Sequence, residues 1–398
     1  MQAVILCAGK STRTYPLTLS TPKPLLKIAN KTILEHNLEQ LRGLVNEVII
    51  VIGYKKEMVK NLFGNKHSSI KLTYVEQKEQ HGTGHALLQA KNILKDRFVL
   101  LNGDDLYSKE DIKRCLKHRY CILVKETKSP EKFGIVLIDG KSVKKILEKP
   151  EKPTTNLTNT GLYVLDKRVF DSEIKKTKRG EYETTDHINK LAKIEKVFYE
   201  KVSDFWLPVG YPWQMLEANE YILKRMKKSR IRGNIEKNAT IKGTVFVGEE
   251  TTIKSGSYIE GPVIIGKNCT IGPNCLIRPC TSIGNNCTVG NASEIKNSIL
   301  MENAAVSHLC YIGDSIIGKN ANIGGGTIAT NWRHDKGNIK TAIYKKDKPT
   351  LVDTERKKFG TVIGDNVHTG ANTVIYPGRK IWPDKTTLPG EIVKKDKT

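Results

Sequence analysis

The chain has 398 residues, which is enough for two or three domains with separate cores. Lysine and arginine total 66 against 42 aspartates and glutamates, and the net charge of +24 favours anionic partners. The lysines are spread over the whole length without an arginine-rich block, which favours phosphorylated small molecules over nucleic acid. No apolar run approaches the ~20 residues that span a bilayer, and no basic segment precedes the first strand, so we expect a cytoplasmic protein without a membrane partner.

Short β-branched runs alternate with amphipathic stretches over residues 3–125. The expected strands are residues 4–6, 48–52, 71–75 and 98–101, and the expected helices are residues 32–43 and 84–94. This alternation is typical of a doubly wound, Rossmann-like α/β sheet. Ligands of such sheets bind beyond the carboxyl ends of the strands, and several motifs begin there.

The first of these motifs follows the first expected strand and runs from Leu6 to Arg13. Gly9 lets backbone N–H groups approach phosphate oxygens, while Arg13 and Lys23 would neutralise a triphosphate. By itself such a loop is weak evidence. Further motifs follow in order: Glu76-Gln77 with Gly82-Thr83-Gly84, Asn102-Gly103-Asp104, Phe133-Gly134, Glu148-Lys149-Pro150 and Asn159-Thr160-Gly161.

This ordered set resembles the sugar-1-phosphate nucleotidylyltransferases over roughly residues 1–225. The resemblance implies that the nucleotide is bound by Leu6, Ala8, Gly9, Thr12, Arg13, Lys23, Gln77, Gly82, Thr83 and Asp104. Within that set it implies catalytic roles for Arg13 and Lys23, base and ribose contacts for Gln77, Gly82 and Thr83, and a Mg²⁺ ligand in Asp104. It also implies a sugar-phosphate pocket made of Gly134, Glu148, Lys149 and Asn159.

The expected chemistry suits these residue types. A sugar 1-phosphate is already ionised at neutral pH, so its attack on the α-phosphorus of a nucleoside triphosphate needs no general base. Positioning, positive charge and Mg²⁺ are sufficient for catalysis. Taken alone, Glu148-Lys149-Pro150 would be a solvated charged turn, and Asp104 alone could cap the helix expected near Ser108. The order and spacing of all the motifs favour a functional site over these explanations.

Two positions depart from the pattern of this family. Ser11 stands where a second glycine is usual, which places a Cβ in a loop where φ can be positive. Pro208 stands where the family often has a second metal-binding aspartate, and proline cannot ligate Mg²⁺. Either Asp104, the phosphates and water hold the metal, or nucleotidyl transfer is weakened; we expect the activity to be retained.

The second half of the chain is dominated by a period of six. After a helix expected from about Trp213 to Lys228, an Ile or Val returns at every sixth position from Ile235 to Ile295. Neither a helix nor an ordinary strand gives this period, whereas a coil of short parallel strands does. We therefore predict a parallel β-helix of hexapeptide repeats over residues 229–398, after a nucleotidyltransferase domain with its connecting helix over residues 1–228.

Two interruptions of the column carry polar residues. The column is expected to break after Ile295, around His308, and again over residues 329–361, before hexads resume at Ile363. Segments of the latter length within a repeat are usually functional. Three cysteines each stand two positions before a repeat Ile or Val and are predicted to fill the core rather than bind metal or form disulfides: Cys269, Cys275 and Cys287.

The repeat resembles the hexapeptide-repeat acyltransferases, which implies a left-handed β-helix, a homotrimer and acetyl-CoA as co-substrate. Five polar residues match positions that bind or react with the amino sugar phosphate in bacterial bifunctional enzymes that make UDP-N-acetylglucosamine: Arg278, Lys296, His308, Tyr311 and Asn322. The same resemblance implies a substrate contact for Lys340, with Lys336 as a rival, and acetyl-CoA contacts for Gly325, Asn331 and Ala371.

Acetyl transfer to an amine requires the neutral amine, and an imidazole of ordinary pKa ~6.5 can take its proton near pH 7. His308 is the candidate base of this region, with Arg278 and Lys296 as clamps on the phosphate.

The chain is thus predicted to acetylate glucosamine 1-phosphate and to transfer a uridylyl group from UTP to the product with Mg²⁺. Galactosamine 1-phosphate, glucose 1-phosphate and dTTP remain open as substrates. Two alternatives also remain: a nucleotidylyltransferase whose β-helix only assembles or regulates, and a non-catalytic regulatory subunit.

Overall fold

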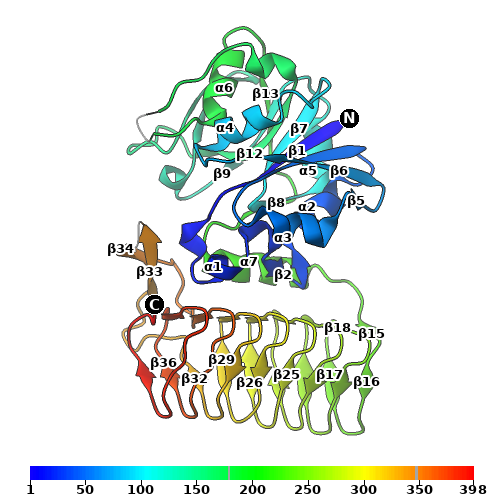
Figure 1. The fold of residues 1–398 in the computed structure, drawn as a ribbon, viewed down its shortest axis with the longest axis vertical. Helices are drawn as coiled ribbons and strands as arrows, with labels where there is room; N and C mark the ends of the chain where they lie inside the picture. The colour runs from blue at the N-terminus through cyan, green and yellow to red at the C-terminus, as the bar shows by residue number, and fades with distance from the viewer. Residues whose placement is uncertain (178–179, 346–347) are drawn as a thin grey trace. The chain divides into compact units, whose positions relative to one another are not determined.

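A computed structural model describes residues 1–177, 180–345 and 348–398 (Figure 1). Packing divides them into two compact units. The first comprises Met1–Lys10, Pro22–Leu25 and Ile33–Pro208, and the second Ser11–Thr21, Leu26–Thr32 and Val209–Thr398. No helix in the described part of the chain is long and apolar enough to cross a membrane.

The first unit contains a ten-stranded sheet. Its strands in spatial order are β10 (Ile135–Asp139), β11 (Ser142–Leu147), β13 (Phe198–Lys201), β9 (Cys121–Glu126), β12 (Leu157–Leu165), β7 (Phe98–Asn102), β1 (Gln2–Cys7), β4 (Glu47–Ile52), β6 (Ile70–Glu76) and β5 (Lys66–His67). Strands β7, β1, β4 and β6 are neighbours and run parallel. They are the four strands predicted from the β-branched runs, which are thereby confirmed.

Helices cover both faces of this sheet because successive residues of its strands point to opposite sides. Ala3 and Ile5 of β1 share a core with Leu34, whereas Val4 shares the opposite core with Leu87. The first core is covered by α2 (Ile33–Leu41), α3 (Lys56–Phe63) and α5 (Lys109–Cys115), and the second by α4 (Thr83–Gln89) and α6 (Thr184–Leu191). The predicted doubly wound α/β domain is confirmed.

Helix α4 is shorter than the helix predicted over residues 84–94, since it ends at Gln89. The cause is a tertiary contact. The side-chain amide of Gln2 donates to the carbonyl of Ile93 and accepts from the backbone N–H of Lys95. These hydrogen bonds satisfy the backbone outside a helix.

The second unit contains a β-helix with three parallel sheets, drawn from green to red in Figure 1. The first sheet is β15 (Arg230–Ile231), β18 (Val245–Val247), β21 (Val263–Ile265), β24 (Thr281–Ile283), β27 (Ile299–Leu300), β30 (Ile316–Ile317), β35 (Val362–Ile363) and β37 (Lys380–Ile381). The second is β16 (Asn234–Ile235), β19 (Thr252–Ile253), β22 (Thr270–Ile271), β25 (Thr288–Val289), β28 (Ala305–Val306) and β31 (Asn322–Ile323). The third is β17 (Thr240–Lys242), β20 (Tyr258–Glu260), β23 (Leu276–Ile277), β26 (Glu294–Lys296), β29 (Tyr311–Gly313), β32 (Ile328–Ala329), β36 (Val374–Ile375) and β38 (Ile392–Val393).

The register of the coils explains both the period of six and its end. Ile253 pairs with Ile271, eighteen positions on, so three hexads make one coil. Ile283 pairs with Leu300, only seventeen positions on, because the corner after β26 has one residue fewer. The strict spacing ends at Ile295 as predicted. The expectation that the column breaks around His308 is wrong, since the inward column continues on every coil with a shifted count.

A long insertion separates β32 from β35. It contains an antiparallel hairpin of β33 (Lys340–Lys345) and β34 (Lys348–Asp353). Ile317 then pairs with Ile363, which confirms where the hexads resume. The three cysteines predicted as core fillers are buried and unpaired in the core of the coil, as expected.

Helix α7 (Pro212–Lys224) packs within the second unit together with α1 (Leu17–Ser20) and the hairpin β2 (Lys27–Ile28)–β3 (Lys31–Thr32). Asn219 of α7 is buried, accepts from the backbone N–H of Ala29 and donates to the carbonyl of Cys280. α7 ends four residues before the predicted Lys228. The sequence boundary after residue 228 therefore differs from the division by packing, and it stays a prediction.

Candidate functional site

The carboxyl ends of β1, β4, β6 and β7 bring the first set of candidate residues together. The backbone N–H of Gly103 donates to the carbonyl of Leu6, and that of Tyr54 donates to the carbonyl of Ala8. A Cβ on Gly103 would clash with that Leu6 carbonyl. The glycine therefore permits a close approach that places Asp104 beside the loop after β1.

Lys23 and Asp104 form an ion pair at this edge. The Nζ atom of Lys23, which lies in the 3₁₀ helix η2 (Lys23–Leu25), is 2.7 Å from Oδ2 of Asp104. The Lys23 side chain is 3% exposed and that of Asp104 is 39% exposed, so the pair has one buried and one accessible partner. Asp104 is not the cap of α5, because the side chain of Ser108 accepts from the N-terminal backbone of that helix.

The accessible carboxylate of Asp104 fits Mg²⁺, which proteins bind through one or two carboxylates together with substrate phosphates. The described residues contain no group of three or more His, Cys, Asp or Glu side chains that could hold a metal by themselves. Pro208 of β14 (Trp206–Pro208) pairs with Asp105 of β8 (Asp105–Tyr107), the residue next to Asp104. Proline thus lies beside the candidate ligand and adds no carboxylate. A site on Asp104 alone would depend on phosphates and water for its other ligands.

Ser11, Thr12 and Arg13 pack within the second unit. Ser11 has a φ of 54°, which confirms the positive φ expected there, and its carbonyl accepts from the hydroxyls of Thr14 and Thr18. These hydrogen bonds offset the strain of a left-handed serine. Thr12 and Arg13 lie in the 3₁₀ helix η1 (Thr12–Thr14), and the Arg13 guanidinium is 5.1 Å from the ring centre of Tyr211.

The candidate base and ribose contacts lie together after β6. Nε2 of Gln77 donates to the carbonyl of Gly82 at 3.0 Å, and the hydroxyl of Thr83 accepts from the backbone N–H of Thr184. Gly53 joins this group to the first loop, because a Cβ there would lie 2.9 Å from the Ala8 carbonyl oxygen and 3.0 Å from that of Gln77.

The four residues predicted to line the sugar-phosphate pocket are also neighbours. The backbone N–H of Asn159 donates to the carbonyl of Gly134, and a Cβ on Gly134 would lie 2.9 Å from Oε2 of Glu148. Lys149 follows with its Nζ atom 3.8 Å from Oε1 of Glu148. Glu148 therefore faces the neighbouring glycine rather than forming an isolated solvated turn.

Sequence analysis missed Tyr163 in this pocket. The Asn159 amide donates to the Tyr163 hydroxyl at 2.6 Å, and burial raises the pKa of that phenol above its ordinary range. Tyr163 thereby fixes the Asn159 side chain. An aromatic residue inside a core strand gives no sequence signal for such a role.

On the β-helix, three predicted amino-sugar contacts lie on adjacent strands of the third sheet: Arg278 after β23, Lys296 at the end of β26 and Tyr311 at the start of β29. An Arg278 guanidinium nitrogen is 3.0 Å from a carboxylate oxygen of Glu294, which pairs with Tyr311. Burial lowers the pKa of Lys296. The Asn331 amide donates to the Tyr311 hydroxyl at 3.2 Å, so Asn331 joins this group.

Asp314 is a further member that the sequence did not single out. It is buried and accepts hydrogen bonds from the amides of Asn331 at 2.6 Å and Asn297 at 2.7 Å. This carboxylate holds Asn331 toward Tyr311. Asparagine or aspartate with positive φ occurs at many corners of the coil. The sequence therefore did not distinguish Asp314 from these structural corner residues.

His308, Gly325 and Ala371 stack in one corner column of successive coils. The N–H of Gly326 donates to the carbonyl of His308, that of Asn372 to the carbonyl of Gly325, and that of Gly390 to the carbonyl of Ala371. A Cβ on Gly325 would lie 3.5 Å from the Cβ of His308. The candidate base is exposed and lies beside the candidate acetyl-CoA contacts.

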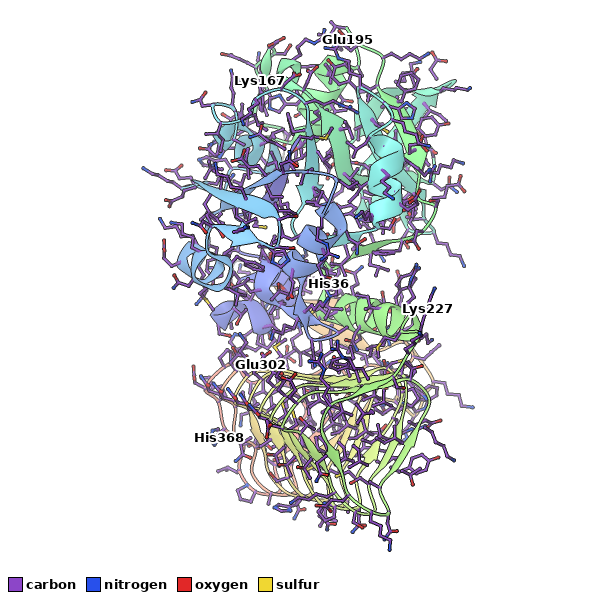
Figure 2. All side chains as sticks on the ribbon, turned by 90° about the vertical axis from the view of Figure 1, so that its right-hand side faces the viewer. His36, Lys167, Glu195, Lys227, Glu302 and His368 are labelled. Carbon is purple, nitrogen blue, oxygen red and sulfur yellow. The ribbon has the colours of Figure 1, made fainter. Side chains whose placement is uncertain are left out.

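The structure does not bring Asn322 and Lys340 to this group. Asn322 lies on β31 in the second sheet and bridges to His368, whose exposed side chain Figure 2 shows on the β-helix. Lys340 is exposed on β33, and its carbonyl accepts from Arg379. The choice between Lys336 and Lys340 stays a prediction.

Comparison with known proteins covers both halves of the chain. The nucleotidyl transferase family matches residues 2–225, and the GMPPB C-terminal domain matches residues 259–395. The first match contains strands β1 to β14, and the second contains the coils from β21 to β38.

Full-length relatives share both parts. Bifunctional protein GlmU of Methanocaldococcus jannaschii is 44% identical over 385 residues, which cover 96% of this chain and 92% of that protein. The bifunctional sugar-1-phosphate nucleotidylyltransferase/acetyltransferase of Sulfurisphaera tokodaii is 36% identical over 405 residues, covering 100% of this chain and 98% of that protein. The crystal structure of UDP-glucose pyrophosphorylase complexed with UDP-glucose, 23% identical with a TM-score of 0.52, covers 56% of this chain and 99% of its own and shows the fold of the first part. The chain belongs to the nucleotidyl transferase family and to the bifunctional GlmU proteins.

Proposed function

We propose that this chain is a bifunctional enzyme that makes UDP-N-acetylglucosamine from glucosamine 1-phosphate. It acetylates the 2-amino group with acetyl-CoA and then transfers a uridylyl group from UTP to the acetylated sugar phosphate, releasing pyrophosphate. One observation carries the proposal: relatives named bifunctional match nearly the whole chain, and each half of this chain holds its own cluster of suitable side chains.

In nucleotidyl transfer, a phosphate oxygen of the sugar phosphate attacks the α-phosphorus of UTP, and the bond to the β-phosphate breaks. Lys23 and Arg13 bind the negatively charged phosphates, and the loop of Leu6, Ala8, Gly9 and Thr12 supplies backbone N–H groups. Asp104 would hold Mg²⁺ with the phosphates, and the ion would neutralise charge on the leaving pyrophosphate. The buried ammonium of Lys23 pairs with Asp104, so a positive charge lies next to the proposed metal ligand and can stabilise negative charge on the phosphates.

The sugar is oriented by the group around Gly134. Its lack of a side chain leaves room beside the Glu148 carboxylate, which can accept from sugar hydroxyls. Asn159, fixed by Tyr163, and Lys149 complete this pocket. These residues bind and position, and none needs to move a proton.

In acetyl transfer, the amine attacks the thioester carbonyl, the bond to sulfur breaks and coenzyme A leaves. His308 takes the proton from the amine. Arg278 and Lys296 hold the phosphate, and Tyr311 orients the sugar. Asn331, which donates to the Tyr311 hydroxyl, contacts acetyl-CoA together with the corner backbone of Gly325 and Ala371. Asn322 and Lys340 remain proposed sugar contacts.

A homotrimer is part of the proposal. Several large apolar side chains of the β-helix are exposed, including Leu309 at 63% beside His308 and Leu388 at 74%. Another subunit could cover exposed apolar side chains of this size. A subunit that covers Leu309 would lie next to the candidate base His308.

The test is incubation of the chain with glucosamine 1-phosphate, acetyl-CoA, UTP and Mg²⁺, with products read by mass spectrometry. We expect N-acetylglucosamine 1-phosphate, UDP-N-acetylglucosamine and pyrophosphate. Galactosamine 1-phosphate, glucose 1-phosphate and dTTP in parallel reactions define the substrate range. Nucleotidyl transfer without acetylation would show a β-helix that only assembles or regulates, and no product in any reaction would show a regulatory subunit.

A further inference from the structure

Gln77, the candidate contact to the nucleobase, is hydrogen-bonded to a histidine that has no assigned role. Gln77 is buried, and its Nε2 atom lies 3.0 Å from both the carbonyl oxygen of Gly82 and Nδ1 of His85 on α4. The Gln89 amide nitrogen donates to the backbone carbonyl of His85 at 3.0 Å and lies 3.3 Å from Nε2 of the same ring.

The chemistry of these contacts fixes the orientation of the Gln77 amide. A carbonyl oxygen can only accept, so the amide atom facing Gly82 must be the NH₂ group. Its second hydrogen points to Nδ1 of His85, which must then carry a lone pair, and the imidazole proton resides on Nε2. Both N–H bonds of Gln77 are used. Only Oε1 remains, and it is an acceptor without a hydrogen-bond partner among the described residues.

The same contacts oppose an imidazolium. With a second proton on Nδ1, the ring of His85 would present an N–H group to the Gln77 NH₂ group, which the carbonyl of Gly82 holds in place. The ring must therefore be neutral for the Gln77 orientation to persist.

We propose that His85 is a positioning residue that sets the base preference of nucleotidyl transfer by holding Gln77 as a hydrogen-bond acceptor. This rests on the proposed nucleotidyl transfer from UTP. The acceptor matches the N3–H of uracil or thymine. It repels cytosine, which presents a lone pair at N3, so the site selects a base with an imide edge over cytosine.

Both acidic and basic groups lie near His85. His81 lies with its ring centre 5.3 Å from that of His85 and hydrogen-bonds Glu79, while Lys176 and Tyr182 approach from the segment before α6. Burial, followed by His81, lowers the pKa of His85 below its ordinary value, whereas Glu79 opposes this shift. Burial thus acts in the same direction as the Gln77 contact, which requires a neutral ring.

Two substitutions separate positioning from mere structure. His85→Leu removes the acceptor, and we expect KM for UTP to rise about tenfold, kcat to change less than about twofold, and the UTP-over-CTP ratio of kcat/KM to fall about tenfold. His85→Asn can place an amide oxygen near the position of Nδ1, so it should retain the preference for UTP. A His85→Leu enzyme with an unchanged KM and an unchanged UTP-over-CTP ratio would overturn the proposal.

The pH profile gives an independent readout. KM of the parent enzyme for UTP should rise as pH falls from 7 to 5 more steeply than that of His85→Asn, since the titration of UTP itself is common to both. His81→Gln, which removes the neighbouring ring and leaves the Gln77 contacts, should retain the steeper profile. Identical profiles for the parent and His85→Asn would contradict the proposal.

Failure of the inference can be told from failure of the proposed function. A parent enzyme that releases no pyrophosphate from UTP refutes the proposed function. For that case, and for variants that do not fold, ¹⁵N spectra of the parent chain labelled at histidine report the tautomer directly. A neutral His85 protonated at Nε2 supports the positioning role, and a proton at Nδ1 overturns it.

Discussion

At the strand ends of the first unit, the candidate residues lie on loops that glycines hold in close contact, whereas on the β-helix they project from strands and corners that repeat on every coil. Gly103 and Gly53 each allow carbonyl groups to approach within distances that a Cβ would forbid. On the β-helix, Arg278, Lys296 and Tyr311 need no special backbone, because adjacent strands place them side by side. The first site depends on unusual loops, and the second on small changes to a regular surface.

The largest expected effect separates the two sites through the candidate base. His308→Ala should lower acetyl transfer about a thousandfold, because no other group in the corner column can take the proton of the amine. Uridylyl transfer should be unchanged. The measurement is kcat for each reaction in the same preparation, and acetylation of glucosamine 1-phosphate at the parental rate would show that His308 is not the base.

Lys23→Ala is the converse change in the first unit. Removing the buried ammonium takes away the cation next to Asp104 and should lower uridylyl transfer by about 10²-fold. Acetyl transfer should stay at the parental rate. Pyrophosphate release and coenzyme A release, measured separately, check the result; a parallel loss of both activities would mean that the variant is misfolded or that the sites are not independent.

Acid stability should also distinguish the units. His187 of α6 is 1% exposed and burial lowers its pKa to about 4, whereas the three histidines of the β-helix are exposed. The unfolded chain, with a histidine pKa of ~6.5, binds the proton more readily. The free energy of unfolding should therefore fall as pH drops from about 6.5 to 4, by about 3 kcal/mol.

Urea unfolding of the parent chain and His187→Leu at pH 7 and pH 4 measures this contribution. The variant should lose less stability between the two pH values than the parent. If both lose the same amount, His187 does not titrate as its burial implies.

Asp314→Asn should give the smallest effect. An amide offers one acceptor oxygen where the carboxylate offers two, so either Asn331 or Asn297 loses its partner. We expect KM for glucosamine 1-phosphate to rise about tenfold with uridylyl transfer unchanged. Initial rates over a range of substrate concentrations check this, and a parental KM would exclude a positioning role for Asp314.

Sequence patterns predicted the scaffold well because each pattern has a direct physical cause. Short β-branched runs identified β1, β4, β6 and β7, whose two faces lie in two cores, and inward Ile and Val residues identified the coil. The patterns failed where tertiary contacts decide. Gln2 shortened α4, and a corner with one residue fewer shifted the hexad count without breaking the column.

For the candidate sites, the sequence also predicted part of the arrangement and missed part of it. Residues from separate motifs, such as Gly134 and Glu148, came together as expected. Supporting residues escaped, because Tyr163, Asp314 and His85 act through another side chain and carry no motif of their own. Asn322 was grouped with Tyr311 by resemblance, yet the two lie on different sheets of one coil.

The most direct test of two independent chemistries in one chain is to mix the His308→Ala and Lys23→Ala enzymes with glucosamine 1-phosphate, acetyl-CoA, UTP and Mg²⁺. Neither variant alone should make UDP-N-acetylglucosamine at a substantial rate, and the mixture should make it, since the acetylated intermediate diffuses from one enzyme to the other. Failure of the mixture while each variant keeps its remaining activity would contradict two separable sites.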